Sequence, residues 1–113
     1  MSIERRLHPR ILMNWPATLH NVQGSIEGET KDISVDGVFI FLSEKPKVGV
    51  NFPILLKPSD GRSISVVGKK VWSSTFSIDN RPVFGMGVQF MLISPEDRRF
   101  ISTLVEKESR GAP

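Results

Sequence analysis

Apolar residues along this chain fall into short runs that are typical of β-strands. Residues 37–42, GVFIFL, form a continuous apolar run rich in β-branched and aromatic residues, which predicts a buried strand. Asp60-Gly61 predicts a hairpin, and turn-forming residues separate most of the other runs. The predicted strands are residues 11–19, 25–34, 37–42, 50–58, 63–76 and 83–92. Short strands at this spacing favour a mainly β fold, a barrel.

The end of the chain changes to a helical pattern. Ser94 suits a helix cap and Pro95 suits the first helical position, and the acids Glu96 and Asp97 oppose the helix dipole. Apolar residues then recur at helical spacing, at Phe100, Ile101, Leu104 and Val105. We therefore expect a single domain with three parts: a flexible basic arm at residues 1–10, a barrel at 11–93 and a helix at 94–110.

Aromatic residues and glycines within the strand runs give expectations about the core. Trp15 is expected in the core or in a hairpin contact. Gly85 and Gly87 lie on one face of the last predicted strand, which indicates close approach of another group or a sharp bend. The phenylalanines expected in the barrel core are Phe39, Phe41, Phe52, Phe84 and Phe90.

Length and composition limit the class of protein. The 113 residues fit one domain, and 39% apolar content is ordinary for a globular chain. No apolar run approaches the length of a membrane span, and the N-terminus lacks the apolar core of a secretion signal. There is no cysteine, which excludes disulfides and thiolate metal sites. We expect a cytoplasmic protein without membrane contact.

Catalytic motifs are missing from the sequence. His8 and His20 have no further ligand at metal spacing, so no metal site is expected. The chain has no nucleophile elbow and no phosphate-binding loop that leads into a helix. We therefore expect a protein that is not an enzyme and that carries no cofactor.

The positive charge is concentrated near the N-terminus. The net charge is +3, and Arg5, Arg6 and Arg10 lie within six residues of one another. Arginine presents a planar fork of donors that suits phosphate oxygens or the edge of guanine. Arg6 and Arg10 are roughly 13 Å apart in an extended chain, far enough to hold two groups of one ligand. This pattern favours a compact anionic ligand over a long polyanion.

A second motif, DISVDG at residues 32–37, carries complementary chemistry. The carboxylate of Asp32 can accept two parallel hydrogen bonds, as the Watson–Crick edge of guanine offers. Ser34 offers a hydroxyl to a phosphate, and Gly37 allows close approach of the backbone. An ordinary turn into the strand at 37–42 explains the same residues. Taken with the arginines, the motif indicates a site for a guanine nucleotide.

Together these motifs resemble those of the PilZ domain family, bacterial receptor modules for cyclic di-GMP. The RxxxR motif is Arg6 to Arg10, and the [D/N]xSxxG motif is Asp32 to Gly37. The segments GMGVQF and SPEDRRFI also look like the family's last strand and closing helix, so the likeness covers residues 4 to 106. The resemblance implies a six-stranded antiparallel barrel with a C-terminal helix and a flexible N-terminal arm.

The resemblance also implies roles for individual residues. Arg6 and Arg10 would hold guanine and phosphate groups, Asp32 and Ser34 would lie beneath the ligand, and Gly37 would give the backbone clearance. Arg5 precedes the motif, where family members differ between one ligand and an intercalated pair. From its place on the strand at 63–76, Trp72 would form a wall beside a purine, although a core or rim position explains it equally well.

These implications lead to a functional hypothesis with two alternatives. We expect a cyclic di-GMP receptor or adaptor whose arm closes over the ligand and creates a docking surface for an unidentified output protein. We expect a monomer or weak dimer and no binding to DNA. The alternatives are a PilZ-like interaction domain that binds no nucleotide, and a small barrel that binds single-stranded nucleic acid.

Overall fold

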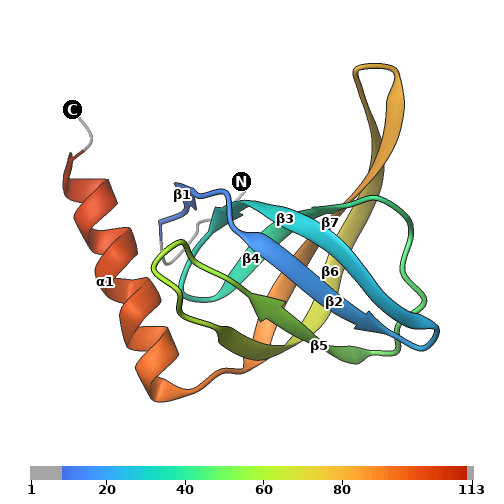
Figure 1. The fold of residues 1–113 in the computed structure, drawn as a ribbon. Coiled ribbons are helices and arrows are strands. Elements are labelled where there is room, and N and C mark those ends of the chain that lie inside the picture. The colour runs from blue at the N-terminus through green and yellow to red at the C-terminus, as the bar shows by residue number, and fades with distance from the viewer. Residues whose placement is uncertain (1–8, 112–113) are drawn as a thin grey trace, which may run out of the picture.

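The computed structural model describes residues 9–111, so Arg5, Arg6 and most of the predicted arm lie outside the described residues. The described strands are β1 (Ile11–Leu12), β2 (Pro16–Asn21), β3 (Gly24–Ile33), β4 (Gly37–Leu42), β5 (Asn51–Leu56), β6 (Ile64–Ile78) and β7 (Arg81–Leu92). Strands β2 to β7 form one antiparallel sheet in the order β3-β2-β5-β6-β7-β4, and pairing of β3 with β4 closes it into a six-stranded barrel (Figure 1). The predicted barrel is therefore confirmed.

The first predicted strand, residues 11–19, is divided in the structure. β1 and β2 pair with different parts of β3, and residues 13–15 between them do not continue the strand. The hydroxyl of Thr30, a buried β3 residue, donates to the carbonyl of Met13 and accepts the backbone N–H of Trp15 at 2.8 Å. One side chain thus satisfies two backbone groups where the chain leaves regular pairing, and it fixes β1 against β3.

The barrel interior is filled by alternate residues of the strands. On β4 the inward side chains are Val38, Ile40 and Leu42. Phe52 and Phe90 are buried in the same core and Phe84 packs against it, as predicted. The prediction was wrong for Phe39 and Phe41, which have the opposite parity on β4 and face outward. The run at residues 37–42 can be apolar on both faces, because aromatic rings of β6 pack against its outward-facing side chains.

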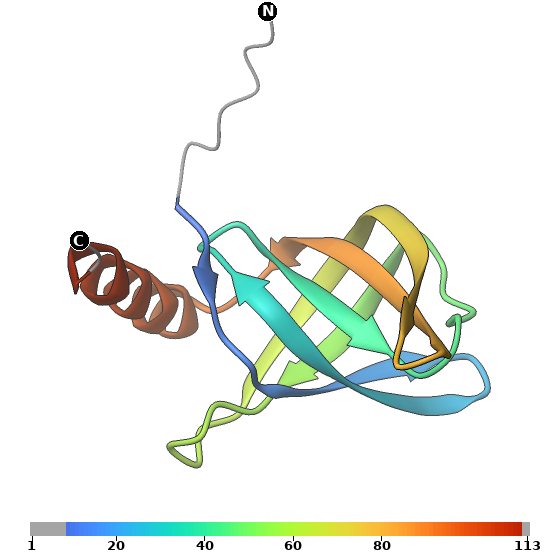
Figure 2. The same cartoon turned by 90° about the horizontal axis from the view of Figure 1, so that it is seen from above.

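The helix α1 (Pro95–Gly111) covers one end of the barrel (Figures 1 and 2). The hydroxyl of Ser94 accepts the backbone N–H of Asp97 at 3.1 Å, which is the predicted cap. Ile101 and Val105 are buried in the core, and the ring of Phe100 stacks on that of Trp15 with centroids 6.3 Å apart. The apolar stripe therefore anchors α1 to the barrel. Within the described residues, no helix has the length and apolar character needed to cross a membrane.

The β6–β7 hairpin extends beyond the rest of the barrel (Figure 1). Its two-residue turn is Asp79-Asn80, and both residues have positive φ, 53° and 64°. This is the turn geometry that matches the twist of a hairpin, and Asp and Asn tolerate it better than most residues. The hairpin thereby carries the end of β6 beyond the part of β7 that pairs with β4.

Candidate functional site

The outer face of the sheet holds a row of four residues from four strands. Asp32 on β3 pairs with Phe39 on β4, which pairs with Gly87 on β7, which pairs with Trp72 on β6. Directly paired residues point to the same face of a sheet. The row therefore places the carboxylate of the second motif and the indole of Trp72 on one surface.

Two irregularities of the sheet set this row. One extra residue, Lys31, interrupts the pairing of β3 with β4, and another, Val71, interrupts the pairing of β6 with β7. An extra residue reverses the faces of all residues beyond it, because side chains alternate along a strand. The two bulges therefore bring Asp32 and Trp72 to the outer face at the same level.

Glycine at positions 85 and 87 lets aromatic rings lie flat on the sheet. A Cβ atom at Gly87 would lie 2.4 Å from Nε1 of Trp72, and one at Gly85 would lie 2.4 Å from the ring of Phe76. The predicted close approach is confirmed, and the approaching groups are these rings. Phe39 lies between them, with its centroid 4.9 Å from that of Trp72. The result is an aromatic cluster on the outside of the barrel.

A cavity of about 600 Å³ lies over this row. Trp72 forms part of its wall, and the side chain of Trp72 is 47% exposed. This position agrees with the predicted wall beside a purine, although contact with a ligand stays a prediction. The residues that line the cavity are Arg10, Asp32, Asp36, Gly37, Phe39, Val71, Trp72, Gly87, Val88 and Gln89.

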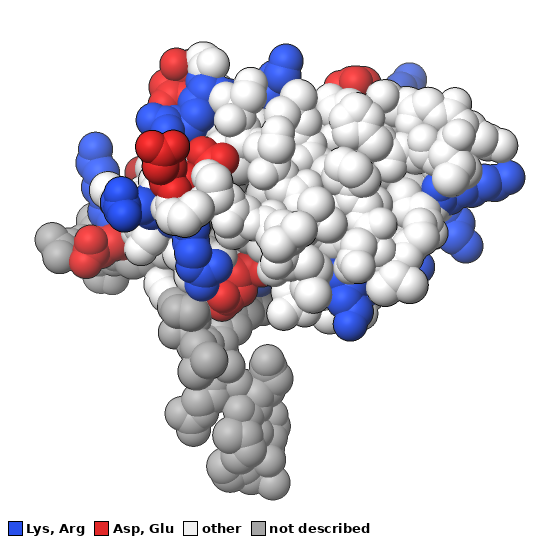
Figure 3. Space-filling model, turned by 90° about the horizontal axis from the view of Figure 1, so that it is seen from below, with Lys and Arg blue, Asp and Glu red and all other residues white. Residues whose placement is uncertain are grey.

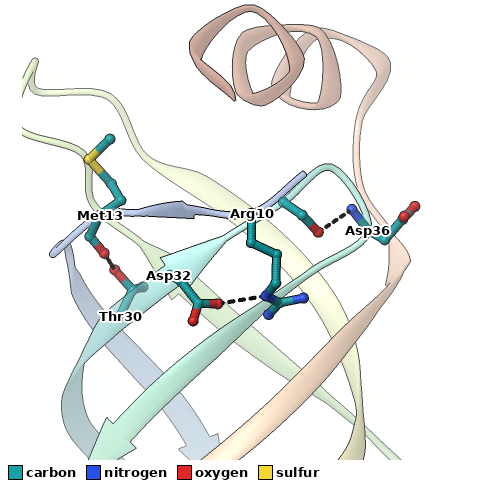
Figure 4. Close-up of polar contacts among 6 residues, drawn as sticks. Arg10, Met13, Thr30, Asp32 and Asp36 are labelled. Carbon is teal, nitrogen blue, oxygen red and sulfur yellow. Dashed lines mark hydrogen bonds and ion pairs between the residues drawn. The ribbon is translucent and has the colours of Figure 1, made fainter. Parts of the chain in front are cut away.

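Arg10 and Asp32 join the two sequence motifs by an ion pair. Nε of Arg10 donates to Oδ1 of Asp32 at 2.8 Å, and the side chains are 26% and 19% exposed (Figure 4). The pair lies at the cavity, where both residues were predicted to act. Sequence reasoning placed them in one site but did not predict that they pair with each other.

Ser34 and Gly37 shape the turn between β3 and β4. The hydroxyl oxygen of Ser34 accepts the backbone N–H of Asp36 at 3.1 Å, and the N–H of Ser34 donates to the carbonyl of Gly37. Ser34 is only 2% exposed and does not line the cavity, unlike the expected position beneath a ligand. Its contact with a phosphate remains a prediction.

Gly37 lines the cavity but also has a structural reason to be glycine. A Cβ atom there would lie 2.2 Å from the carbonyl oxygen of Val88 on the neighbouring strand β7. Any side chain would push β4 away from β7. The glycine is therefore explained by close strand packing, in addition to the predicted clearance for a ligand.

Arg98, Asp36 and Gln89 were missed by sequence reasoning. Asp36 and Gln89 line the cavity, and Arg98 on α1 reaches the turn that contains Asp36. Nη1 of Arg98 donates to the carbonyl of Val35 at 3.1 Å, and Nη2 lies 3.4 Å from Oδ1 of Asp36. In the sequence, the DRR segment of the closing helix was a signal only for a helix start.

Charged side chains are unevenly distributed over the surface. Seen from below, the barrel has a broad face without Lys, Arg, Asp or Glu, and charged side chains gather mainly at the α1 end and around the rim (Figure 3). This face carries no continuous basic stripe. Among the described residues, no group of three or more His, Cys, Asp or Glu side chains is placed to hold a metal ion.

Comparison with known families shows to which family the chain belongs. The sequence matches the PilZ domain over residues 4–107. The chain belongs to the PilZ domain family. No curated protein matches it in sequence.

Solved PilZ structures share the fold of this domain. The PilZ domain of YcgR from Escherichia coli with c-di-GMP has a TM-score of 0.74 at 17% identity, and the match covers 95% of both chains. The K. pneumonia MrkH-c-di-GMP complex has a TM-score of 0.76 at 16% identity, and the match covers 96% of this chain and 53% of that one. The Bacillus subtilis inhibitor of motility (MotI/DgrA) has a TM-score of 0.77 at 13% identity, and the match covers 96% of this chain and 53% of that one. This PilZ chain thus spans about half the length of two of these proteins.

Proposed function

We propose that this PilZ domain binds cyclic di-GMP in the cavity over β3, β4, β7 and β6, and that it acts as a receptor or adaptor in bacterial second-messenger signalling. The observation that carries the proposal is the meeting of Arg10 and Asp32 at one cavity with an aromatic wall. YcgR and MrkH, which share the fold, are described in complex with c-di-GMP.

The ion pair leaves donors and acceptors for a ligand. A guanidinium has five N–H groups, and Arg10 uses Nε toward Asp32, so its two Nη groups can donate to a phosphate or to guanine. The carboxylate of Asp32 can accept further bonds from the N–H groups of a guanine edge. The pair also fixes the direction of the guanidinium before a ligand arrives, which lowers the entropy lost on binding.

The aromatic cluster suits the base of a nucleotide. Trp72 is half exposed at the cavity and is supported from behind by Phe39. A ligand that stacks a purine on the indole and extends across Gly87 and Phe39 would reach the carboxylate, because Trp72 and Asp32 are the two ends of the same row. Stacking of a base on an aromatic side chain contributes roughly 1–3 kcal/mol.

The arrangement of aromatic side chains favours a small nucleotide over a nucleic-acid strand. A protein that binds single strands needs a basic groove with stacking positions along it. The described aromatic positions on the outer face form one cluster and do not continue along a groove. A compact ligand with two phosphates suits a single cavity that is lined by Arg10 of the RxxxR motif.

Calorimetric titration with cyclic di-GMP, GMP and a short single-stranded oligonucleotide tests this proposal. We expect saturable binding of cyclic di-GMP and much weaker binding of the other two. Preference for the oligonucleotide would instead favour the nucleic-acid-binding alternative. Absence of binding to all three would leave an interaction domain without a nucleotide.

We also propose that the ligand-loaded surface docks an output protein. The β6–β7 hairpin carries exposed apolar side chains: Val71 lines the cavity at 61% exposure, and Ile78 lies next to the hairpin turn at 44% exposure. A ligand bound next to this hairpin would change the surface that a partner meets. Affinity capture with and without cyclic di-GMP tests the idea, and an identical set of captured proteins would contradict it.

A further inference from the structure

The outer part of β6, residues 71–78, has one edge without a strand beside it; we call this the free β6 edge. β5 pairs with β6 only from Ile64 to Lys69, whereas β7 pairs with β6 on the other side as far as Ile78. Among the described residues, no backbone hydrogen bond joins residues 71–78 to any element other than β7. All of these residues are exposed. Alternate N–H and C=O groups on the free β6 edge therefore face solvent, which is the arrangement that binds another strand.

The two edges of the β6–β7 hairpin differ in their protection. Proteins usually protect exposed strand edges with proline, with charged side chains or by keeping the edge short. On β7 only Arg81–Val83 precede the first residue that pairs with β4, and this short edge contains both Arg81 and Pro82. The free β6 edge is longer, and its sequence VWSSTFSI contains neither proline nor a charged residue. The hairpin is thus protected against strand addition on β7 and open to it on β6.

Apolar side chains along the free β6 edge favour a further strand beside it. Trp72 and Phe76 both pack with Phe39 on the outer face of the sheet, and Ile78 follows on the same face. Trp72, Phe76 and Ile78 nevertheless remain 47%, 37% and 44% exposed. A ribbon of two strands is marginally stable in water, whereas three or more strands with an apolar face are stable. A further strand would use the free backbone groups and add apolar neighbours to these side chains.

From these observations we infer that the free β6 edge pairs antiparallel with the same edge of a second copy of this chain. The segment is complementary to itself: a two-fold axis at Ser74 places Trp72 of each copy opposite Phe76 of the other. Residues of equal parity then face each other, so the outer faces of the two hairpins join into one surface. Because residues 71–78 carry no charge, no like charges meet across the axis.

This pairing uses neither Arg10 nor Asp32, so it is tested on the ligand-free protein and stands or falls separately from the proposed function. Sedimentation equilibrium of the wild type should show a reversible equilibrium between monomer and dimer. In amide hydrogen exchange followed by NMR, the protection of alternate amides within residues 71–78 should rise with protein concentration. A wild-type protein that stays monomeric at NMR concentrations, or a dimer without this rise in protection, would overturn the inference.

Charged substitutions at Ser74 test the two-fold register. Ser74→Lys and Ser74→Glu each bring like charges together on the axis, and each should raise the dissociation constant of the dimer by roughly two- to fivefold at low salt. An equimolar mixture of the two variants should form a dimer at least as tight as that of the wild type, because opposite charges then meet. A general disturbance of the fold would not be reversed by mixing.

Ser65→Lys is the matched control. Ser65 is an exposed serine of the same strand, but it lies opposite Leu55 of β5 and away from the free β6 edge. The substitution adds the same charge and should leave the dissociation constant of the dimer unchanged. If Ser74→Lys dimerises as well as Ser65→Lys, the free β6 edge is not the interface and the inference is wrong. If a Ser74 variant fails to fold, as judged by thermal denaturation, the exchange pattern of the wild type decides.

Discussion

Replacement of Arg10 by alanine separates a ligand-binding role from a structural one. Arg10 touches the described part of the chain through one polar contact, the ion pair with Asp32. Both side chains retain some exposure, 26% and 19%, so Asp32 stays partly hydrated when its partner is removed. Pairs of this kind contribute about 1 kcal/mol or less to stability, and we expect Arg10→Ala to lower the melting temperature of the ligand-free protein by only a few degrees.

The effect of Arg10→Ala on binding should be much larger. Two Nη groups remain for the ligand, and hydrogen bonds to charged groups contribute roughly 1.5–3 kcal/mol each. Loss of both corresponds to roughly 3–6 kcal/mol, which is at least a hundredfold in affinity. Arg10→Lys keeps the charge but loses the planar fork, so it should bind with an intermediate affinity.

Thermal denaturation of the ligand-free proteins and calorimetry with cyclic di-GMP measure the two effects. Arg99→Ala serves as a control for the change in net charge and should match the wild type in both. A loss of stability above about 3 kcal/mol in Arg10→Ala would show that the ion pair is structural, since that is the cost of breaking a buried pair. Unchanged affinity would refute the proposed arginine contacts.

Three further predictions address the fold, the aromatic wall and the ionic contacts. Thr30→Val leaves the carbonyl of Met13 and the N–H of Trp15 without their partner, and should lower the free energy of unfolding by about 2–4 kcal/mol in urea denaturation. The control Thr18→Val loses only a surface bond to Glu27 and should change the free energy of unfolding by less than about 0.5 kcal/mol. Gly87→Ala brings a Cβ atom to 2.4 Å from the Trp72 indole, so the ring must move; we expect a shifted tryptophan emission spectrum and weaker ligand binding, and an unchanged spectrum would contradict the close packing. Ligand affinity should fall as NaCl rises, because the arginine contacts are ionic and partly exposed, and a flat profile in calorimetry would argue against them.

The barrel and the helix were predictable because their signals are local. The apolar stripe from Phe100 to Val105 and the cap at Ser94 define α1 without knowledge of the rest of the chain. The strands of the barrel likewise follow from apolar runs and turn residues. The break at residues 13–15 was not predictable, because it depends on Thr30, a residue that is distant in sequence and acts through its hydroxyl.

The outer aromatic cluster shows where periodicity fails. A run such as residues 37–42 is apolar at every position, so it does not distinguish the face of Phe39 from that of Val38. The distinguishing signal lay on another strand, where Gly85 and Gly87 leave room for rings on one face of β7. Rings over those glycines cover Phe39 from outside, which makes it buried without belonging to the barrel core.

Part of the candidate site depends on contacts that no short motif can encode. Arg10 and Asp32 were predictable because each motif carries its own chemistry, but their ion pair requires β1 to lie beside β3. The contact of Arg98 with the turn at Asp36 requires α1 to start near that turn, and this follows from the closure of the barrel, because β4 pairs with β7 and β7 leads directly into α1. The turn that lines the candidate cavity is therefore bound to the helix by one side chain, whereas Trp72 lines the same cavity from the β6–β7 hairpin.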